Sequence, residues 1–426
     1  MNVNKKKLTT EYKKRRKLGQ FFTSEILVDY ITKIFQINFS DKEILEPSFG
    51  GCSFIKYIKE NSKNNHITAI DIDKKLCAKY SGEFEDIDFI CKDFLSYETN
   101  KKFDIAIGNP PFNLKTKYNY YDSTEGFLIK SLKMLKPSGY LYFVMPSTIL
   151  RNKQYQRLRE LIINNYKIEG IINTSDYEFL GADIETIFIC IKNEKVKQQK
   201  YFYISDNSKK EIILKVNKRF TILLNNTKTS QKLKEKIGNQ NLGLIFDIYR
   251  GKSDNKNSLK GRQINYYNHY LKMKSGNEYF IGLQNIAYRF TSNLIRGDKG
   301  KINDTITLLV PKTKNDCKYL CFISEFLNSS IANYFLHVNA LNGCKLTIHI
   351  DKYYIEDMPV PSYDSSFNQY ITQLNKIGNT KEVGEFRNNY FYKLFNLTKP
   401  EIVEIESLWT YPKFREKHQY VLKEEI

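Results

Sequence analysis

Cysteine and histidine are scarce in this sequence of 426 residues. The seven cysteines include no Cys-x-x-Cys pair, and their number is odd; they stand at positions 52, 77, 91, 190, 317, 321 and 344. This pattern argues against a disulfide framework and against a structural zinc site. The five histidines are scattered, so we predict no metal centre. Unpaired thiols of this kind are typical of a reducing compartment, and we expect a cytoplasmic protein.

Long apolar runs and negative charge are also lacking. No stretch reaches the length that spans a bilayer, and the lysines near the N-terminus have no apolar segment behind them, so we expect neither a membrane anchor nor a secretion signal. Lysine and arginine number 67 against 47 acidic residues, a formal net charge of +20. Such an excess favours a polyanionic partner, most often nucleic acid. A composition rich in lysine, asparagine, isoleucine and tyrosine is also typical of an AT-rich genome, so charge alone does not decide.

The most informative motif is the tetrapeptide NPPF, which is formed by Asn109, Pro110, Pro111 and Phe112. It follows the apolar run 103–108, which has the length of one buried strand and is stopped by glycine and proline. The Asn side-chain oxygen and a proline carbonyl can accept hydrogen bonds from the N6 amine of adenine, which frees its lone pair for attack on a methyl donor. Phe112 offers a ring face to an extruded base. The same string also arises as an ordinary proline turn, so its surroundings must decide.

Three strand ends before this motif carry residues suited to a nucleotide-like cofactor. A glycine turn follows the strand that ends at Glu46, and it contains Ser48 and Gly50. Asp71 ends the second strand, about 20 residues further on, where an acid can hold ribose hydroxyls. Asp93 follows the third strand and can accept a hydrogen bond from an adenine amine. Because ligands of open α/β sheets bind beyond the carboxyl ends of strands, we expect these residues to meet.

The pattern from residue 18 to about 195 alternates strands and helices. We expect helices at 126–136 and 151–165, strands at 140–145, 167–172 and 186–192, and a helix after Thr23, which can act as its N-cap. This alternation predicts an α/β domain with a mostly parallel sheet covered by helices on both faces. The strand at 186–192 follows its predecessor closely, as in a hairpin, and we expect it to be antiparallel.

In the order and spacing of these motifs the chain resembles the TaqI-like, gamma-class adenine-specific DNA methyltransferases. The resemblance covers most of residues 18–195 and, more weakly, parts of 240–405. It implies an S-adenosylmethionine-dependent, Rossmann-like catalytic domain followed by a mixed α/β target-recognition domain. The implied activity is methylation of a flipped adenine at N6 in double-stranded DNA. The implied setting is a restriction-modification system, with a separate endonuclease acting on the same site.

The resemblance also implies roles for individual residues. Thr23, Glu46 and Ser48 lie near the methionine end of the cofactor, Asp71 holds the ribose, and Ile72, Asp93 and Phe94 surround the adenine. The catalytic residues are Asn109, Pro110, Pro111 and Phe112, and Phe179 joins Phe112 in stacking on the target base. The chain departs from the family pattern at Cys52, where the family usually has a second glycine, and at Phe112, where tyrosine is commoner.

The remaining segments give thinner indications. Residues 1–17 carry eight basic side chains and one glutamate, a net +7, and form either a solvated tail or an arm lying on phosphates. We place the catalytic domain at 18–200, a lysine- and asparagine-rich boundary region at 201–235, and the recognition domain at 236–426. In the last we expect one amphipathic helix at 319–337, a strand-like segment at 345–357 and a capping box at Thr398.

Base readout in the recognition domain requires polar side chains in a DNA groove. Its candidates are Arg250, Lys252, Arg262, Arg289 and Arg296. Most surface arginines contact phosphate or nothing, so the sequence does not select among them.

Three alternatives stay open at this stage. Asn-Pro-Pro-aromatic loops also serve enzymes that methylate adenine in RNA or glutamine in proteins, although such chains usually lack a large basic C-terminal unit. A non-catalytic DNA-binding specificity protein is opposed by the intact NPPF motif. A fused nuclease would need its own site, and Asp183, Glu185 and Lys192 are poorly spaced for one.

Overall fold

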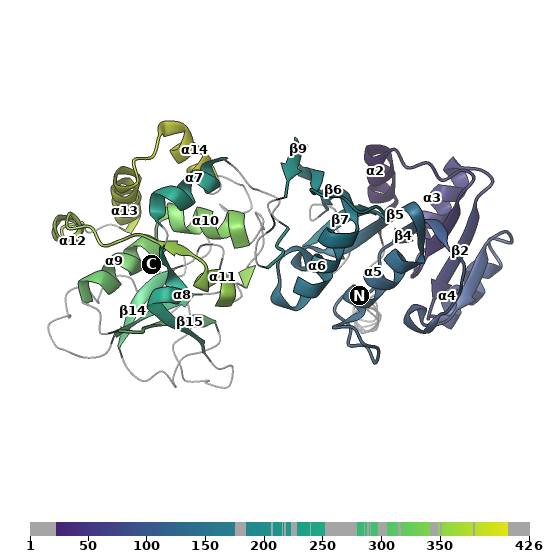
Figure 1. The fold of residues 1–426 in the computed structure, drawn as a ribbon, viewed down its shortest axis with the longest axis horizontal. Helices are drawn as coiled ribbons and strands as arrows, with labels where there is room; N and C mark the ends of the chain where they lie inside the picture. The colour runs from purple at the N-terminus through teal and green to yellow at the C-terminus, as the bar shows by residue number, and fades with distance from the viewer. Residues whose placement is uncertain are drawn as a thin grey trace, which may run out of the picture. The chain divides into compact units, whose positions relative to one another are not determined.

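The computed structural model of the protein describes most of the chain (Figure 1). The described residues are 23–174, 185–205, 208–214, 216, 219–222, 228–238, 240–251, 279–284, 286–287, 289, 291–296, 305–313, 317–340, 348–349, 352–377 and 380–407. The basic arm at 1–17 and Phe179 lie outside this set. Residues 1–222 and 223–426 form two compact units. In the described part of the chain no helix is both long enough and apolar enough to cross a bilayer.

A nine-stranded sheet is the centre of the first unit, with strand order β3-β2-β1-β4-β5-β7-β6-β8-β9. The strands are β1 (Glu43–Glu46), β2 (His66–Asp71), β3 (Asp88–Cys91), β4 (Phe103–Gly108), β5 (Leu135–Pro146), β6 (Lys167–Asn173), β7 (Thr186–Lys192), β8 (Lys200–Ser205) and β9 (Ser208–Ile213). Strands β1 to β5 are mutually parallel where they pair. Strand β7 is antiparallel to both β5 and β6, which confirms the expected hairpin-like reversal.

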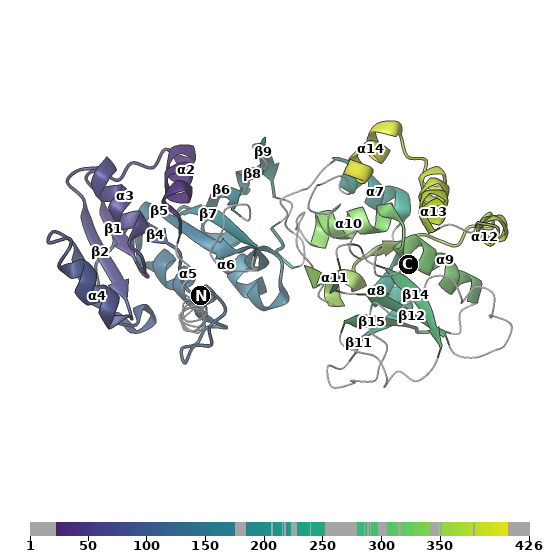
Figure 2. The ribbon, with the colours of Figure 1, turned by 180° about the vertical axis from the view of Figure 1, so that it is seen from behind.

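Helices cover both faces of this sheet (Figures 1 and 2). They are α2 (Glu25–Phe35), α3 (Ser53–Asn61), α4 (Lys74–Ser81), α5 (Ser123–Met134) and α6 (Gln156–Asn165). Apolar residues of α2, α3 and α4 share one buried cluster with alternate residues of β1, β2 and β4. The intervening strand residues face the other way, where α5 contacts β4 and β5 and α6 contacts β6. The predicted doubly covered α/β sheet is therefore confirmed.

Several local predictions for this unit were wrong in detail. The N-cap of α2 is Ser24, whose Oγ accepts from the Leu27 N–H at 3.3 Å, and not Thr23. Helix α5 begins at Ser123, three residues before the predicted start, because Asp122 caps it by accepting from the Glu125 N–H at 3.0 Å. Strands β8 and β9 fall in the stretch predicted to be a boundary region, yet they extend the sheet of the first unit.

The second unit is built on the four-stranded antiparallel sheet β11-β15-β12-β14. The strands are β11 (Phe246–Arg250), β12 (Tyr279–Gln284), β14 (Ser292–Arg296) and β15 (Ile306–Pro311). Helices pack with it around one apolar core. The helices of eight or more residues are α7 (Lys228–Ile237), α9 (Cys317–Leu327), α10 (Ser330–Ala340), α12 (Phe367–Leu374), α13 (Thr380–Leu394) and α14 (Lys399–Ser407). This confirms a mixed α/β unit.

The single helix predicted at 319–337 is wrong, because the chain breaks between α9 and α10. The Asn328 amide accepts from the Ser292 N–H at 2.7 Å and donates to the Ser292 carbonyl at 2.9 Å. This two-point contact anchors the break to β14. Arg289, predicted as a possible base reader, donates to Ser330 Oγ at 3.4 Å beside the same junction. Asn328 and Arg289 therefore have structural contacts at the junction between α9 and α10.

The predicted strand at 345–357 is also wrong for most of its described part. Only the short β16 (Ile348–His349) is extended, and α11 (Lys352–Glu356) follows it. The capping box at Thr398 is confirmed in its glutamate half, because the Thr398 N–H donates to Glu401 at 2.9 Å at the start of α14. Of the other arginine and lysine candidates, Arg250 lies exposed in β11, whereas Lys252 and Arg262 lie outside the described residues.

Candidate functional site

A cavity of about 440 Å³ opens at the carboxyl ends of β1 to β4. Each strand contributes its terminal or following residues, because parallel neighbours end at the same edge of a sheet. The order β3-β2-β1-β4 places the cavity where strand order reverses about β1. Ten of the predicted site residues line it: Thr23, Glu46, Ser48, Gly50, Asp71, Ile72, Asp93, Phe94, Asn109 and Pro111.

The glycine turn after β1 is held by the acid at the end of β2. Asp71 accepts the Gly50 N–H and the Asp73 N–H, both at 2.9 Å. Gly50 has φ of 48°, in the left-handed region that glycine adopts readily. Burial raises the pKa of Asp71, although the backbone N–H groups of Asp73 and Gly50 oppose that shift. Each oxygen that accepts one N–H keeps a lone pair, so Asp71 can still accept ribose hydroxyls.

Cys52 shows how the chain manages without the expected second glycine. It adopts φ of 60° and ψ of 23°, the left-handed conformation, directly before α3. Its side chain is fully buried. The backbone turn is therefore preserved with a residue type that adopts it at a cost of about 1 kcal/mol. Burial, followed by the charge of Glu46, raises the pKa of the thiol, so Cys52 is a packing residue and not a nucleophile.

Glu46 is the most unusual group in the cavity. Its side chain is only 2% exposed, and its Oε2 atom has no hydrogen-bond partner among the residues that the structure describes. Burial, and then the charge of Asp71, raise its pKa well above the usual range of a glutamate. A buried carboxylate without a partner is costly, and a cationic ligand would relieve that cost. S-adenosylmethionine carries an ammonium group and a sulfonium group, so this environment fits it.

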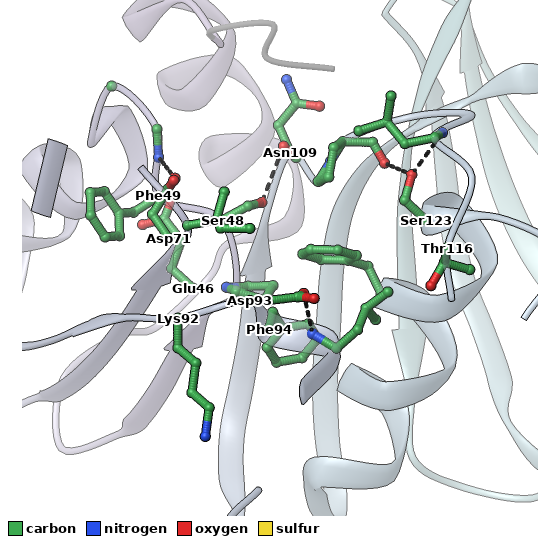
Figure 3. A pocket seen from close by; sticks show the side chains of 18 of the residues that line it. Glu46, Ser48, Phe49, Asp71, Lys92, Asp93, Phe94, Asn109, Thr116 and Ser123 are labelled. Atoms are coloured by element: carbon green, nitrogen blue, oxygen red, sulfur yellow. Dashed lines mark hydrogen bonds between the residues drawn. The ribbon is translucent and has the colours of Figure 1, made fainter. Parts of the chain in front are cut away.

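Ile72, Asp93 and Phe94, the residues predicted to surround the cofactor adenine, line one part of the cavity. Ile72 is 61% exposed, which is unusual for a large aliphatic side chain and gives a flat base an apolar surface. Asp93 caps a short 3-10 turn by accepting the Leu95 N–H at 3.0 Å. Figure 3 shows Asp93 and Phe94 below Ser48 and Asn109 in the same cavity.

The NPPF motif lies directly beyond β4, beside the glycine turn after β1 that is predicted to bind the cofactor and is called the cofactor turn below. Ser48 Oγ donates to the Asn109 carbonyl at 3.3 Å, so the turn after β1 and the motif after β4 are in contact (Figure 3). The side-chain oxygen of Asn109 is buried. Pro110 and Phe112 do not line the cavity; Phe112 is 5% exposed and belongs to the core cluster that includes α2. The structure thus brings the residues predicted to bind the cofactor together with Asn109 and Pro111 in one cavity, but the Phe112 ring stays packed in the core.

Sequence reasoning missed the loop that follows the motif. Leu114, Lys115, Thr116, Lys117 and Tyr118 all line the cavity. The lysine and tyrosine residues gathered in this loop were one signal for a ligand contact. A second signal was the run Asp122-Ser123-Thr124-Glu125, a capping pattern that places the start of α5 and hence the end of the loop.

Comparisons with known proteins agree with this geometry. Residues 2–179 match the family model of the Eco57I restriction-modification methylases. The Type II methyltransferase M.CvrRI of Paramecium bursaria Chlorella virus XZ-6E is 25% identical over 246 residues, which cover 55% of this chain and 62% of that protein. Modification methylase CviBIII of Paramecium bursaria Chlorella virus NC1A is 31% identical over 204 residues, with coverage of 44% and 52%. The chain spans about half the length of the curated relatives it matches.

One solved structure resembles nearly the whole chain. The Type IIL restriction-modification enzyme MmeI, solved in complex with DNA, aligns with a TM-score of 0.51 and 10% identity over 98% of this chain and 77% of that one. At such low identity the likeness concerns the fold alone. The family match indicates the chemistry of the cavity. All residues that line the cavity lie within the matched region, and the cofactor of the protein is S-adenosylmethionine.

Proposed function

We propose that the protein methylates N6 of adenine in double-stranded DNA, since residues 2–179 match the family model of the Eco57I restriction-modification methylases. The observation that carries this proposal is the contact between the cofactor turn and the NPPF motif. Ser48 and Asn109 are joined by a hydrogen bond of 3.3 Å at the edge of one cavity. A donor methyl group and an acceptor amine bound there would be neighbours.

The motif supplies acceptors that suit the N6 amine. The Asn109 side-chain oxygen and the Pro110 carbonyl accept its two N–H groups, which localises the nitrogen lone pair. Bound S-adenosylmethionine would supply the methyl group from its sulfonium sulfur, with S-adenosylhomocysteine as the leaving group, and the methylated amine would lose one proton to solvent. Proline fixes the backbone at both central positions of the motif, so the acceptors are placed before the substrate arrives.

The target adenine must leave the duplex to reach this motif, at a cost of a few kcal/mol. We infer that Phe112 and Phe179 stack on the flipped base. Phe112 is packed in the core, so stacking requires its ring to become accessible when DNA binds. Phe179→Ala should then reduce the fluorescence increase of 2-aminopurine placed at the target position, and an unchanged signal would remove Phe179 from this role.

The net charge of +20 supports DNA as the polyanionic partner. The second unit is proposed as the part that selects the site. If phosphates dominate binding, the logarithm of the affinity should fall linearly with the logarithm of salt concentration, by about 0.9 per neutralised phosphate. A flat salt response would oppose a DNA partner. The free thiols Cys52, Cys77, Cys91, Cys190 and Cys321 suit a cytoplasmic enzyme. The match to restriction-modification methylases supports the proposal that it modifies the sites of a separate endonuclease.

The decisive experiment measures where the methyl group goes. The purified protein is incubated with methyl-labelled S-adenosylmethionine and, in separate reactions, with unmethylated double-stranded DNA, RNA and protein extract. We expect label in DNA alone, and single-molecule sequencing of that DNA should show N6-methyladenine in one sequence motif. Label in RNA or in protein glutamine, or methylation of cytosine, would overturn the proposal. Asn109→Ala is the matched inactive control.

A further inference from the structure

The loop after the NPPF motif is closed on itself by backbone contacts. The Leu114 N–H donates to Ser123 Oγ at 3.1 Å, and the Ser123 N–H donates to the Leu114 carbonyl at 2.8 Å. The ends of a ten-residue segment therefore meet, as in compact surface loops that often carry function. Tyr155 anchors its root through a hydrogen bond of 3.1 Å from its hydroxyl to the Asn113 side-chain oxygen.

The first half of this loop forms one wall of the cofactor cavity. At its tip the Tyr118 hydroxyl donates to Asp93 Oδ2 at 3.0 Å. The Tyr118 backbone is itself held, because its N–H donates to Thr116 Oγ1 at 3.1 Å and its carbonyl accepts the Tyr120 N–H at 2.8 Å. The loop thus reaches across the cavity wall to the acid that follows β3.

Asp93 retains room for a ligand despite these contacts. An ionised carboxylate has about four lone-pair sites. The Leu95 N–H uses one on Oδ1 and the Tyr118 hydroxyl uses one on Oδ2. The two contacts fix the plane of the carboxylate, whose terminal torsion is otherwise broad. The remaining lone pairs are therefore directed before any ligand binds.

We propose that Tyr118 is a positioning residue for the cofactor, which orients Asp93 to accept the adenine amino group of S-adenosylmethionine. This inference rests on the cofactor and on the role given to Asp93 in the proposed function. The loop also connects the two ends of the site. Ser123 Oγ, which accepts from Leu114, donates to the Pro111 carbonyl at 2.8 Å (Figure 3). The wall that holds the cofactor adenine is thereby attached to the catalytic motif.

The test is equilibrium binding of S-adenosylmethionine to the full-length protein without DNA. Tyr118→Phe removes only the hydroxyl, and we expect the dissociation constant to rise about fivefold, as for loss of one hydrogen bond. Tyr121→Phe is the matched control, because its ring is 59% exposed, packs against Tyr155 and does not line the cavity. It should bind within twofold of the unsubstituted protein. Because no DNA is present, this result does not depend on which base is methylated.

A cofactor analogue separates positioning from a merely structural role. With 6-deamino S-adenosylmethionine, in which hydrogen replaces the adenine amino group, the acceptor on Asp93 has nothing to receive. The effect of Tyr118→Phe should then shrink to less than twofold, as a double-substitution cycle requires for coupled groups. An equal effect with both cofactors would overturn the proposal, and so would unchanged or tighter binding of S-adenosylmethionine to Tyr118→Phe.

Discussion

Two buried glutamates, one in each unit, show opposite uses of the same side chain. Glu325 in α9 is 2% exposed, and it accepts from Arg387 Nε at 2.8 Å and from the Tyr370 hydroxyl at 2.6 Å. Glu46 at the end of β1 is equally buried, but its Oε2 atom has no partner in the described part of the chain. A buried carboxylate with hydrogen-bond partners stabilises one packing arrangement, whereas a buried carboxylate without them is stabilised when a cation binds beside it. Glu325 therefore serves the packing of the second unit, whereas Glu46 is available to a ligand of the first.

The sharpest test of this contrast removes a side chain of the cavity that should be needed for methyl transfer and not for stability. Asn109→Ala should lower methyl transfer by about 1,000-fold, because an acceptor aimed at the reacting amine is lost. Binding of S-adenosylmethionine and of DNA should stay within a few-fold, and the unfolding temperature should hardly move. Single-turnover rates, with calorimetry alongside, provide the measurement. Retained turnover would remove Asn109 from catalysis.

The converse substitution lies in the second unit. Arg387→Met leaves the Glu325 charge buried without its cation, and we expect the unfolding free energy of this unit to fall by about 3 kcal/mol. Scanning calorimetry resolves the transition. Lys200→Met is the control, since the Lys200–Glu211 pair is exposed and should contribute far less. Equal effects of the two substitutions would mean that burial does not separate these ion pairs.

Glu46→Gln tests whether the buried carboxylate of Glu46 contributes to the binding of the cationic cofactor. Loss of the charge should weaken S-adenosylmethionine binding at neutral pH by at least about tenfold. The folded-state pKa of Glu46 is raised, so its favourable contribution to stability is complete at low pH and is lost as pH rises through that pKa. The cofactor-free protein should therefore lose stability with rising pH while cofactor affinity increases. Both trends should be weaker in Glu46→Gln. A pH dependence identical to that of the unsubstituted protein would show that another group causes them.

The smallest expected effect concerns backbone strain in the glycine turn. Cys52→Gly removes a left-handed non-glycine residue, whereas Cys52→Ala removes the thiol and keeps the strain. Although glycine usually destabilises relative to alanine, the glycine variant should be the more stable of the two by about 1 kcal/mol. Urea unfolding of both variants measures the difference. A more stable alanine variant would show that this turn carries no strain.

The sequence predicted which residues come together at the ends of the parallel strands. Glu46, Asp71, Asp93 and Asn109 each follow a recognisable apolar run, and parallel pairing alone brings them to one edge. It could not predict the partners that cross from other elements. The Tyr118 contact to Asp93 spans 25 positions, and the packing of Phe112 depends on a helix far away in the sequence. The break at Asn328 was missed for the same reason, because its cause is the backbone of Ser292.

Strands β8 and β9 and the residues 219–222 that follow them determine where the chain can be divided without breaking the first unit. Arg159 is 1% exposed, and its guanidinium donates to the carbonyls of Arg219 at 3.2 Å and Phe220 at 3.1 Å. The Ile222 N–H donates to the Leu150 carbonyl at 3.0 Å. A catalytic fragment cut at residue 200 would lose these acceptors and leave β6 as a bare, aggregation-prone sheet edge. A cut after Ile222 keeps these contacts, and it coincides with the boundary between the two compact units.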